Sequence, residues 1–512
     1  MILIFLNLLI LTFLFNNNNY EIINNISFLN ISSNFLYFNL NYISINTLLM
    51  LIFCSSLVIY YSFHYFNGNN INLNFLISFF ILIMSGLIFT NNIFTTLIFW
   101  ESLGLISFFL ILYYGSYQSS RAANITLITS RVGDSGLFLI LLIFILNFNI
   151  YFNILIVFSL YYIVSTKSAS FPFIGWLLEA MRAPTPVSAL VHSSTLVAAG
   201  VWFFNNYFYY FNNNSLQYIL FFSLITIFIV SVNALVINDI KKLIALSTCN
   251  NINWCLIYLI LGNIELALFQ LFTHGIIKCV LFCVAGDLFN SFLANQNNNM
   301  LNKNYYNNNV FGLSLIILII FLSGWPFVGI FFSKHLFLLN NGIFNLGFSL
   351  IFFFIILFFL SFIYSFRLIG LIFNNLMLIN FNIQNNFFII NFCILYFSFL
   401  NLFVSNNLIE NNNISYFNNF LLNPLILFSI VFGYFLSFNL INSNFFNNIF
   451  NLNVLIEMSY FIIFFLINNL NIFSLIRYEV YLYNNILNNI IFNNFNFLKI
   501  GILFLIFYFI FI

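Results

Sequence analysis

Charge is nearly absent from this chain. Only 4% of its 512 residues are Asp, Glu, Lys or Arg, whereas a soluble domain carries about a quarter. Hydrophobic residues make up 63%, which excludes a soluble globular domain and indicates a chain embedded in lipid. The formal net charge is only +2 and the basic residues form no cluster, so we expect no nucleic-acid partner.

Cysteine is also scarce, and its spacing predicts no chemistry. The six cysteines show no Cys-x-x-Cys pattern, so neither a disulfide framework nor a zinc site is predicted. The sequence contains no phosphate loop, dinucleotide-binding turn or Ser-His-Asp order. The first fifteen residues lack a basic region and a cleavage site, so we expect a short span rather than a removable signal. We expect no metal and no cofactor in this chain.

Long apolar runs fill most of the sequence. A membrane helix needs about 20 such residues, and runs of this length recur, for example at 72–90, 92–114 and 343–369. They do not alternate apolar with polar residues, as the strands of a membrane barrel do. We predict an all-α, polytopic membrane protein with roughly 14 to 16 transmembrane helices. The loops carry asparagine instead of Lys and Arg, so the positive-inside rule gives no orientation.

The few charged residues are therefore informative, since each costs at least about 2.5 kcal/mol at the bilayer centre. Glu101 interrupts an apolar segment, either inside the membrane or at a helix end. Lys167 precedes Pro172 and Gly175, which break a helix. A broken helix at membrane depth is tolerated only when it is buried in protein or lines a wet cavity. The alternative for this lysine is a side chain that reaches the membrane surface.

Two segments share an interrupted pattern. "FPFIGW" (171–176) and "WPFVGI" (325–330) both contain Pro-Phe-x-Gly, and each has a lysine close by, Lys167 and Lys334. Interrupted apolar segments in corresponding positions of two halves are typical of a transporter repeat with its site near the midplane. The sequence thus predicts two broken helices, each with a lysine.

A polar stripe lies on a third segment. Gln270, His274 and Lys278 recur every four residues, so they share one face of a helix. This face either makes helix–helix hydrogen bonds or relays protons, since histidine titrates near neutrality. Metal binding is not predicted, because no second histidine or carboxylate is near. His192 lies among small and hydroxyl residues, which either satisfy it or place it in the same polar path.

Other charged residues are expected to form ion pairs or serve structure: Arg131, Asp134, Glu179, Asp239 and Lys241. The first two are spaced as a local pair, and Asp239 can pair with Lys241 or Lys242. Arg367 is predicted to anchor a helix at the membrane interface.

Several segments together resemble a known family. They are "YYSFHYF" (60–66), "WESLGLIS" (100–107), "SRVGD" (130–134), "KSASFPFIGWLLEAMRAPTPVSALVHSSTLVAAGV" (167–201), "NDIKKLIALST" (238–248), "FQLFTHGIIKCVLF" (269–282), "GIFFSKH" (329–335) and "YSFR" (364–367). The chain resembles the subunit 5 family among the antiporter-like membrane subunits of respiratory complex I. The resemblance covers about residues 60–370, and the two ends match only in hydropathy.

The resemblance implies a proton channel of two inverted five-helix repeats with broken helices. It implies a pathway in which Glu101 pairs with Lys167, with these further members: His192, His274, Lys278, Lys334 and, as a possible exit, His335. The family usually carries histidine where Gln270 stands and an acidic residue where His335 stands. The implied domains are N-terminal helices (1–90), a first repeat (91–212), a second repeat (213–370), C-terminal helices (371–442), a lateral helix or connector (443–495) and a final span (497–512).

The resemblance also implies partners and location. The chain would be an enzyme only as a subunit of H+-translocating NADH:ubiquinone reductase, with flavin, iron–sulfur clusters and ubiquinone in partner subunits. Its partners would be membrane-arm and peripheral-arm subunits and lipids, in the mitochondrial inner membrane. Residues with A- and T-rich codons dominate the composition, which favours an organelle-encoded chain. The alternatives are the large subunit of a Mrp-type sodium/proton antiporter and a structural membrane-arm protein that does not pump.

Overall fold

In a computed structural model of the chain, the elements formed by the described residues are all helices. The structure describes residues 42–66, 68, 71–145, 153–208, 211, 213–291, 309–325, 329–331, 333–334, 337, 348–376 and 427–437. The chain divides into two units, 1–451 and 452–512, and every described residue lies in the first. The predicted lateral helix at 443–495 and final span at 497–512 lie outside the described residues.

The long helices have these bounds: α2 (Tyr42–Tyr65), α3 (Ile71–Phe89), α4 (Ile93–Leu112), α5 (Tyr117–Ile145), α10 (Asn213–Ala234), α11 (Ile240–Ile260), α12 (Ile264–Ser291) and α17 (Phe348–Leu376). A continuous helical run comprises α8 (Thr185–Val187), η3 (Ser188–Thr195) and α9 (Leu196–Asn206). Shorter helices are α6 (Asn153–Ser168), α7 (Gly175–Ala180), α14 (Asn309–Ser323) and the apolar helix Leu427–Ser437.

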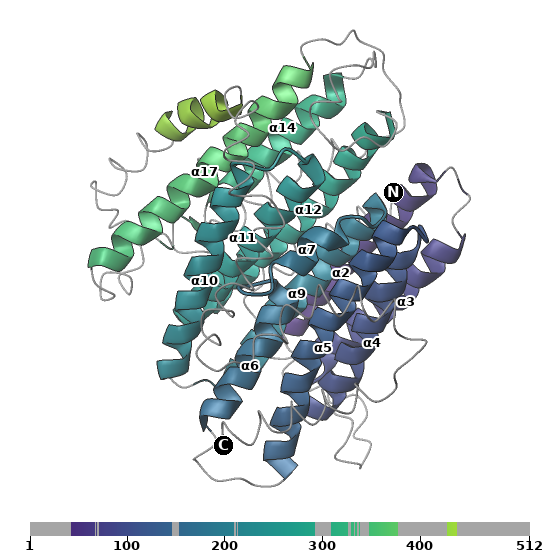
Figure 1. Ribbon diagram of the computed structural model, residues 1–512, viewed down its shortest axis with the longest axis vertical. Coiled ribbons are helices and arrows are strands. Elements are labelled where there is room, and N and C mark those ends of the chain that lie inside the picture. Colours follow the sequence, from purple (N-terminus) through teal and green to yellow (C-terminus); the bar gives the residue numbers. More distant parts are fainter. Residues whose placement is uncertain are drawn as a thin grey trace, which may run out of the picture. The chain divides into compact units, whose positions relative to one another are not determined.

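Nine helices of the described part are long and apolar enough to cross a membrane, with α8, η3 and α9 counted as one. This confirms an all-helical, polytopic membrane protein. Helices α3, α4, α5 and α6 pack in chain order, as do α10, α11 and α12 (Figure 1). Helix α12 occupies the centre, where it contacts α2, η3, α11 and α14.

Burial separates interior from lipid-facing helices. The most apolar windows of α11 and α12 are each 94% buried, whereas that of α3 is 39% buried. On α3, Ile71, Phe75, Phe79 and Leu82 are exposed at spacings of three and four residues, which forms one apolar stripe. The polar side chains in the middle of α12, Gln270, His274 and Lys278, therefore lie inside the protein and not against lipid.

Both predicted helix breaks are present. Helix α6 ends at Ser168 and α7 begins at Gly175, with Ala169 between them at a φ of 54°. That left-handed backbone is costly for a residue with a Cβ and occurs where the chain must leave a helix abruptly. The second break follows α14, where Gly324 has a φ of 85°.

Farther along the chain, after α7 and α8, the segment η3 is a π-helix. In η3 the Thr195 hydroxyl donates to Leu190 O, five residues earlier, at 2.8 Å. Turns of π-helix are rare and occur often at functional sites. Next to it, Gly200 of α9 packs against α6, where a Cβ would lie only 2.8 Å from the backbone N of Ser168. Glycine at this position allows α9 to approach the end of α6.

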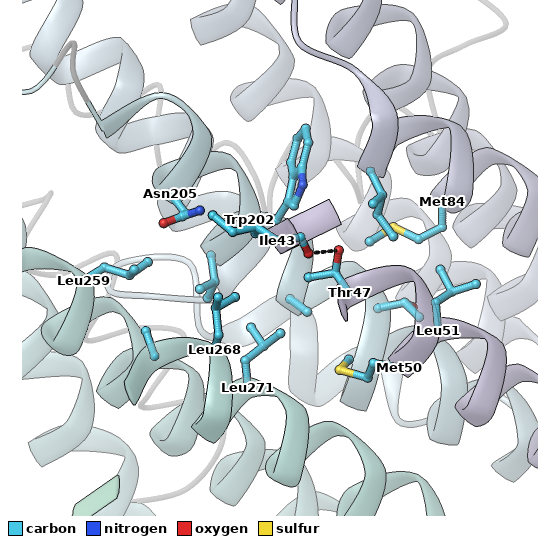
Figure 2. A pocket seen from close by; sticks show the side chains of 15 residues that line it. Ile43, Thr47, Met50, Leu51, Met84, Trp202, Asn205, Leu259, Leu268 and Leu271 are labelled. Carbon is cyan, nitrogen blue, oxygen red and sulfur yellow. Dashed lines mark hydrogen bonds between the residues drawn. The ribbon is translucent and has the colours of Figure 1, made fainter. Parts of the chain in front are cut away.

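An apolar pocket lies between α2, α3, α9, α11 and α12 (Figure 2). None of its fifteen lining residues is charged or a histidine. The hydrogen bond drawn there runs from the Thr47 hydroxyl to Ile43 O, at 3.0 Å, within one turn of α2. The pocket lining is mostly apolar and contains no group that titrates near neutral pH.

Candidate functional site

The first buried lysine lies at the end of α6, beside the first break. Lys167 is 2% exposed, and its Nζ lies 5.1 Å from the ring centroid of Trp100 on α4. Within the described residues Nζ has no hydrogen-bond partner. An aromatic face stabilises a cation by about 2 kcal/mol when the pair is desolvated. The predicted alternative of a lysine that reaches the membrane surface is wrong.

Two charged side chains, Asp134 and Arg131, act on this lysine, and Glu101 contacts the arginine. The carboxylate that interacts with Lys167 is Asp134 of α5, a residue that is 3% exposed. Arg131 Nη1 lies 3.2 Å from Asp134 Oδ2 and 3.6 Å from Glu101 Oε1. The predicted Arg131–Asp134 pair is confirmed. Glu101, by contrast, pairs with Arg131. The family resemblance had implied a pair with Lys167, so that implication is wrong for this structure.

The second buried lysine lies in the middle of α12. Lys278 is fully buried, and its Nζ donates to Ile244 O at 2.9 Å and to the Ser247 hydroxyl, both on α11. His274, one turn earlier, is 1% exposed, and its Nε2 has no hydrogen-bond partner in the part that the structure describes. The predicted polar stripe therefore faces α11 and the protein interior.

Gln270 connects the stripe to the second break. Its Oε1 accepts a hydrogen bond from the Ser333 hydroxyl at 2.7 Å, and its Nε2 donates to Asn251 O at 3.3 Å. Ser333 directly precedes Lys334. This glutamine therefore ties α12 to the segment that carries the third lysine.

The third buried lysine reaches back to the end of α14. Lys334 Nζ donates to Ser323 O at 2.8 Å and to the Ser361 hydroxyl at 3.1 Å. It also lies 5.0 Å from the ring centroid of Phe362. Among the described residues, none of these three lysines has a carboxylate within ion-pair distance, and all are at most 4% exposed.

The remaining predicted residues have mixed outcomes. Glu179 forms an ion pair with Arg182 at 3.0 Å. Asp239 pairs with Lys242 at 2.8 Å. Lys241 forms no ion pair in the described part and instead donates to Ala183 O, just after the first broken helix.

Two predicted histidines stay untested by the geometry. The backbone of His192 lies in η3, but its side chain is outside what the structure describes, as is all of His335.

Arg367 corrects another prediction. It is 1% exposed, so it is no interfacial anchor. Its guanidinium donates to Ala234 O at 2.7 Å and to Ile237 O at 2.8 Å, at the end of α10. The side chain satisfies carbonyls of a neighbouring helix, which hydropathy alone does not reveal.

Some polar members of the site were missed in the sequence. They are Ser247, Asn251, Ser323, Ser333 and Ser361, all buried. Asparagine is so common in this chain that its presence on α11 carried no signal. For Ser247 a signal existed, since it lies in "NDIKKLIALST", the segment that packs against the polar stripe.

These features define the class of protein: a helical membrane protein with buried lysines and two broken helices. Residues 90–364, more than half of the chain, match the family described as NADH:quinone oxidoreductase/Mrp antiporter, TM, and the chain belongs to this family. Among curated relatives, NADH-ubiquinone oxidoreductase chain 5 of Anopheles arabiensis is 33% identical over 318 residues, which cover 59% of this chain and 82% of the relative. The chain is thus recognised as a chain 5 sequence, as its motifs predicted.

Other relatives have the same name. Chain 5 of Locusta migratoria is 34% identical over 65% of this chain and 60% of its own length, and that of Caenorhabditis elegans is 34% identical over 58% and 59%. The chain therefore matches about three fifths of the length of these two relatives.

Solved structures show the same fold at low sequence identity. A chain of the membrane-bound sulfane sulfur reductase, an archaeal respiratory membrane complex, has a TM-score of 0.64 at 16% identity and covers 86% of this chain and 93% of its own. A chain of the Mrp complex from Dietzia has a TM-score of 0.57 at 17% identity, over 92% and 55%.

Proposed function

We propose that this chain is a proton-translocating membrane-arm subunit of NADH:ubiquinone oxidoreductase. Its buried lysines would carry protons across the membrane while partner subunits transfer electrons. The observation that carries the proposal is the burial of Lys167, Lys278 and Lys334 without a carboxylate in ion-pair contact among the described residues. A fixed cation is expensive at that depth, so such an amine suits a group that takes up and releases a proton.

The neighbours of each lysine support proton exchange. Lys278 and Lys334 contact hydroxyls of Ser247 and Ser361, which can both donate and accept a hydrogen bond. Asp134 supplies a negative charge that favours the protonated form of Lys167. Any movement that takes Asp134 away from Lys167 favours release of the lysine's proton. The two residues can therefore act as a switch.

The proposed order of transfer follows the chain of polar groups. Protons would pass from Lys167 by way of His192 to His274 and Lys278, and then to Lys334. The contact between Gln270 and Ser333 supports the last step, since it joins the two segments. Glu101 would act on the first lysine through Arg131, and His335 remains the proposed exit.

The experiment that tests this function replaces a lysine without changing its volume much. Lys278→Met is expected to lower the protons translocated per NADH in the assembled complex, because methionine fills the space but carries no proton. Lys167→Ala should act in the same direction. The matched control is Lys242→Met on the same helix as Ser247, where the lysine is partly exposed and paired with Asp239. Unchanged proton translocation in assembled Lys278→Met and Lys167→Ala complexes would refute the relay.

The same proposal covers partners and location. The other membrane-arm and peripheral-arm subunits would supply flavin, iron–sulfur clusters and ubiquinone, in the mitochondrial inner membrane. A native gel stained for NADH oxidation tests this assignment, because peptides of this chain should follow the stained band. Their migration in an assembly without that activity would favour a sodium/proton antiporter instead.

A further inference from the structure

A second titratable pair lies away from the three lysines, where α2 and α12 end. His64 Nε2 of α2 lies 3.5 Å from Asp287 Oδ1 of α12. The His64 side chain is 42% exposed, whereas that of Asp287 is 11% exposed. The other oxygen, Oδ2, is enclosed and has no hydrogen-bond partner among the described residues. One member of the pair thus reaches the surface and the other points into the protein.

Hydroxyl groups continue inward from this pair. The Tyr61 hydroxyl interacts with the Asp287 carboxylate and lies 3.5 Å from the Thr185 hydroxyl. Ser188, at the start of η3, donates to Thr185 O at 2.9 Å and is fully buried. Gly286 allows the Tyr61 and Thr185 hydroxyls to approach α12, because a Cβ there would lie 2.7 Å from Thr185 Oγ1 and closer still to the Tyr61 hydroxyl.

The two helices are parallel here, so both titratable groups lie at one membrane end. Cys54 of α2 lies beside Cys279 of α12, and seven residues later in each helix Tyr61 lies beside Gly286. Asp287 follows Lys278 by nine residues, about 13 Å along the helix axis at 1.5 Å per residue. That distance is too long for direct proton transfer.

The path from this pair to the lysine must therefore leave α12. Nine residues are two and a half turns, so Asp287 and Lys278 point to opposite faces of the helix. The segment η3 packs against both α12 and α11, the helix that holds the Lys278 amine. The hydroxyls of Thr185 and Ser188 lead into this segment.

Among the described residues, the His64 imidazole is the only group that forms an ion pair with this carboxylate. In the described part, no lysine or arginine lies within ion-pair distance of Asp287. The other titratable groups that face the Tyr61 hydroxyl are Tyr65 of α2 and Cys283 of α12. A plain structural pair would need no buried hydroxyl path behind it.

We propose that His64 and Asp287 form a proton-exchange port for the buried relay. The imidazole takes a proton from water at the surface and gives it to the carboxylate, so the histidine returns to its neutral form. The hydroxyls of Tyr61 and Thr185 then pass it towards η3, whose Ser188 binds the Thr185 carbonyl and which packs against the helix that holds the Lys278 amine. The reverse sequence releases a proton, and neither direction requires an oxidant. This port rests on the proposed proton-translocating function.

The test compares Asp287→Asn, Asp287→Glu and Lys278→Met in the assembled complex. Protons per NADH and the rate of proton uptake are measured between pH 6 and pH 8.5, with NADH alone as the substrate donor. We expect Asp287→Asn to lower the rate of proton uptake about tenfold. This loss is smaller than for a fully enclosed transfer group, because water at the surface replaces part of the action of the carboxylate. The loss should grow with pH, and Asp287→Glu should restore most of the activity.

A matched control lies on the same helix. Glu265, in the first turn of α12 at its other end, is exposed. Glu265→Gln removes one carboxylate as Asp287→Asn does, and it should leave proton uptake unchanged at every pH.

The outcomes separate the port from the relay. If Lys278→Met lowers proton uptake and Asp287→Asn does not, the port is overturned and the relay stays in place. Normal uptake in both variants overturns the proposed function as well. If Asp287→Asn lowers only the thermal stability of the complex, the pair is a structural clamp and the port is wrong.

A second variant tests the port if the Asp287→Asn complex does not assemble. His64→Ala removes the exposed member, and added imidazole can then diffuse to the vacated site. Lost uptake that imidazole restores supports the port. Normal uptake without imidazole, or a loss that imidazole does not restore, overturns it.

Discussion

Replacement of Arg367 by methionine should impair assembly more than any other single loss of charge discussed above. Its guanidinium donates to Ala234 O, Ile237 O and Val236 O at 2.7, 2.8 and 3.4 Å, and to Asn238 Oδ1 at 2.9 Å. Helix α10 ends at Ala234, and the last carbonyls of a helix have no partner within it. A cation at this end also interacts favourably with the helix dipole.

The expected magnitude follows from the groups left without partners. A buried polar group without a hydrogen bond costs about 1–3 kcal/mol, and three backbone carbonyls lose theirs in Arg367→Met. Some of these carbonyls are only partly buried, so water replaces part of the loss. We expect a net cost of about 3–5 kcal/mol, since three such groups lose their partner and water replaces part of the loss. At 1.4 kcal/mol per factor of ten, the equilibrium constant between native and unfolded chains falls about a hundredfold or more.

The assay is the amount of this chain in the assembled complex, together with the thermal denaturation midpoint of that complex. Arg367→Lys should recover only part of the loss, because one ammonium group cannot reach both pairs of acceptors that the planar fork spans. Arg121→Met is the matched control, since Arg121 is exposed on α5. An Arg367→Met complex that assembles and melts like the wild type would refute the capping role.

The sequence predicts the helices, the breaks and the burial of the polar stripe for one physical reason. Charge and proline are costly in lipid, so their positions mark the protein interior even in a single sequence. Lys167 and Lys278 were found in this way, and both are buried. Glycine and proline after α6 likewise place the first break between Ser168 and Gly175.

Contacts between helices were harder to predict. The family resemblance implied Glu101 as the partner of Lys167, but the carboxylate whose charge acts on this lysine is Asp134, which lies beyond ion-pair distance, while Glu101 pairs with Arg131. Spacing within one helix cannot decide this, because the answer depends on how α4, α5 and α6 are rotated against one another. The ion pair of Asp239 could be predicted from spacing within one helix. Asp239 pairs with Lys242, three residues later, whereas residues two apart do not face each other.

Two further predictions concern the polar groups that surround the lysines. Asp134→Asn should lower the protons translocated per NADH at least as much as Glu101→Gln, because the charge of Asp134 acts on Lys167, whereas Glu101 pairs with Arg131. Proton counts for the two variants in assembled complexes check this, and the opposite order would show that the glutamate acts on the lysine in another conformation. Gln270→Ala should slow proton transfer several-fold, since it removes the hydrogen bond to Ser333 and with it the link between α12 and the second break. Gln270→His can keep that hydrogen bond and adds a titratable group, so it should retain translocation. Equal rates for the alanine and histidine variants would mean that protons reach the third lysine by a route that avoids this contact.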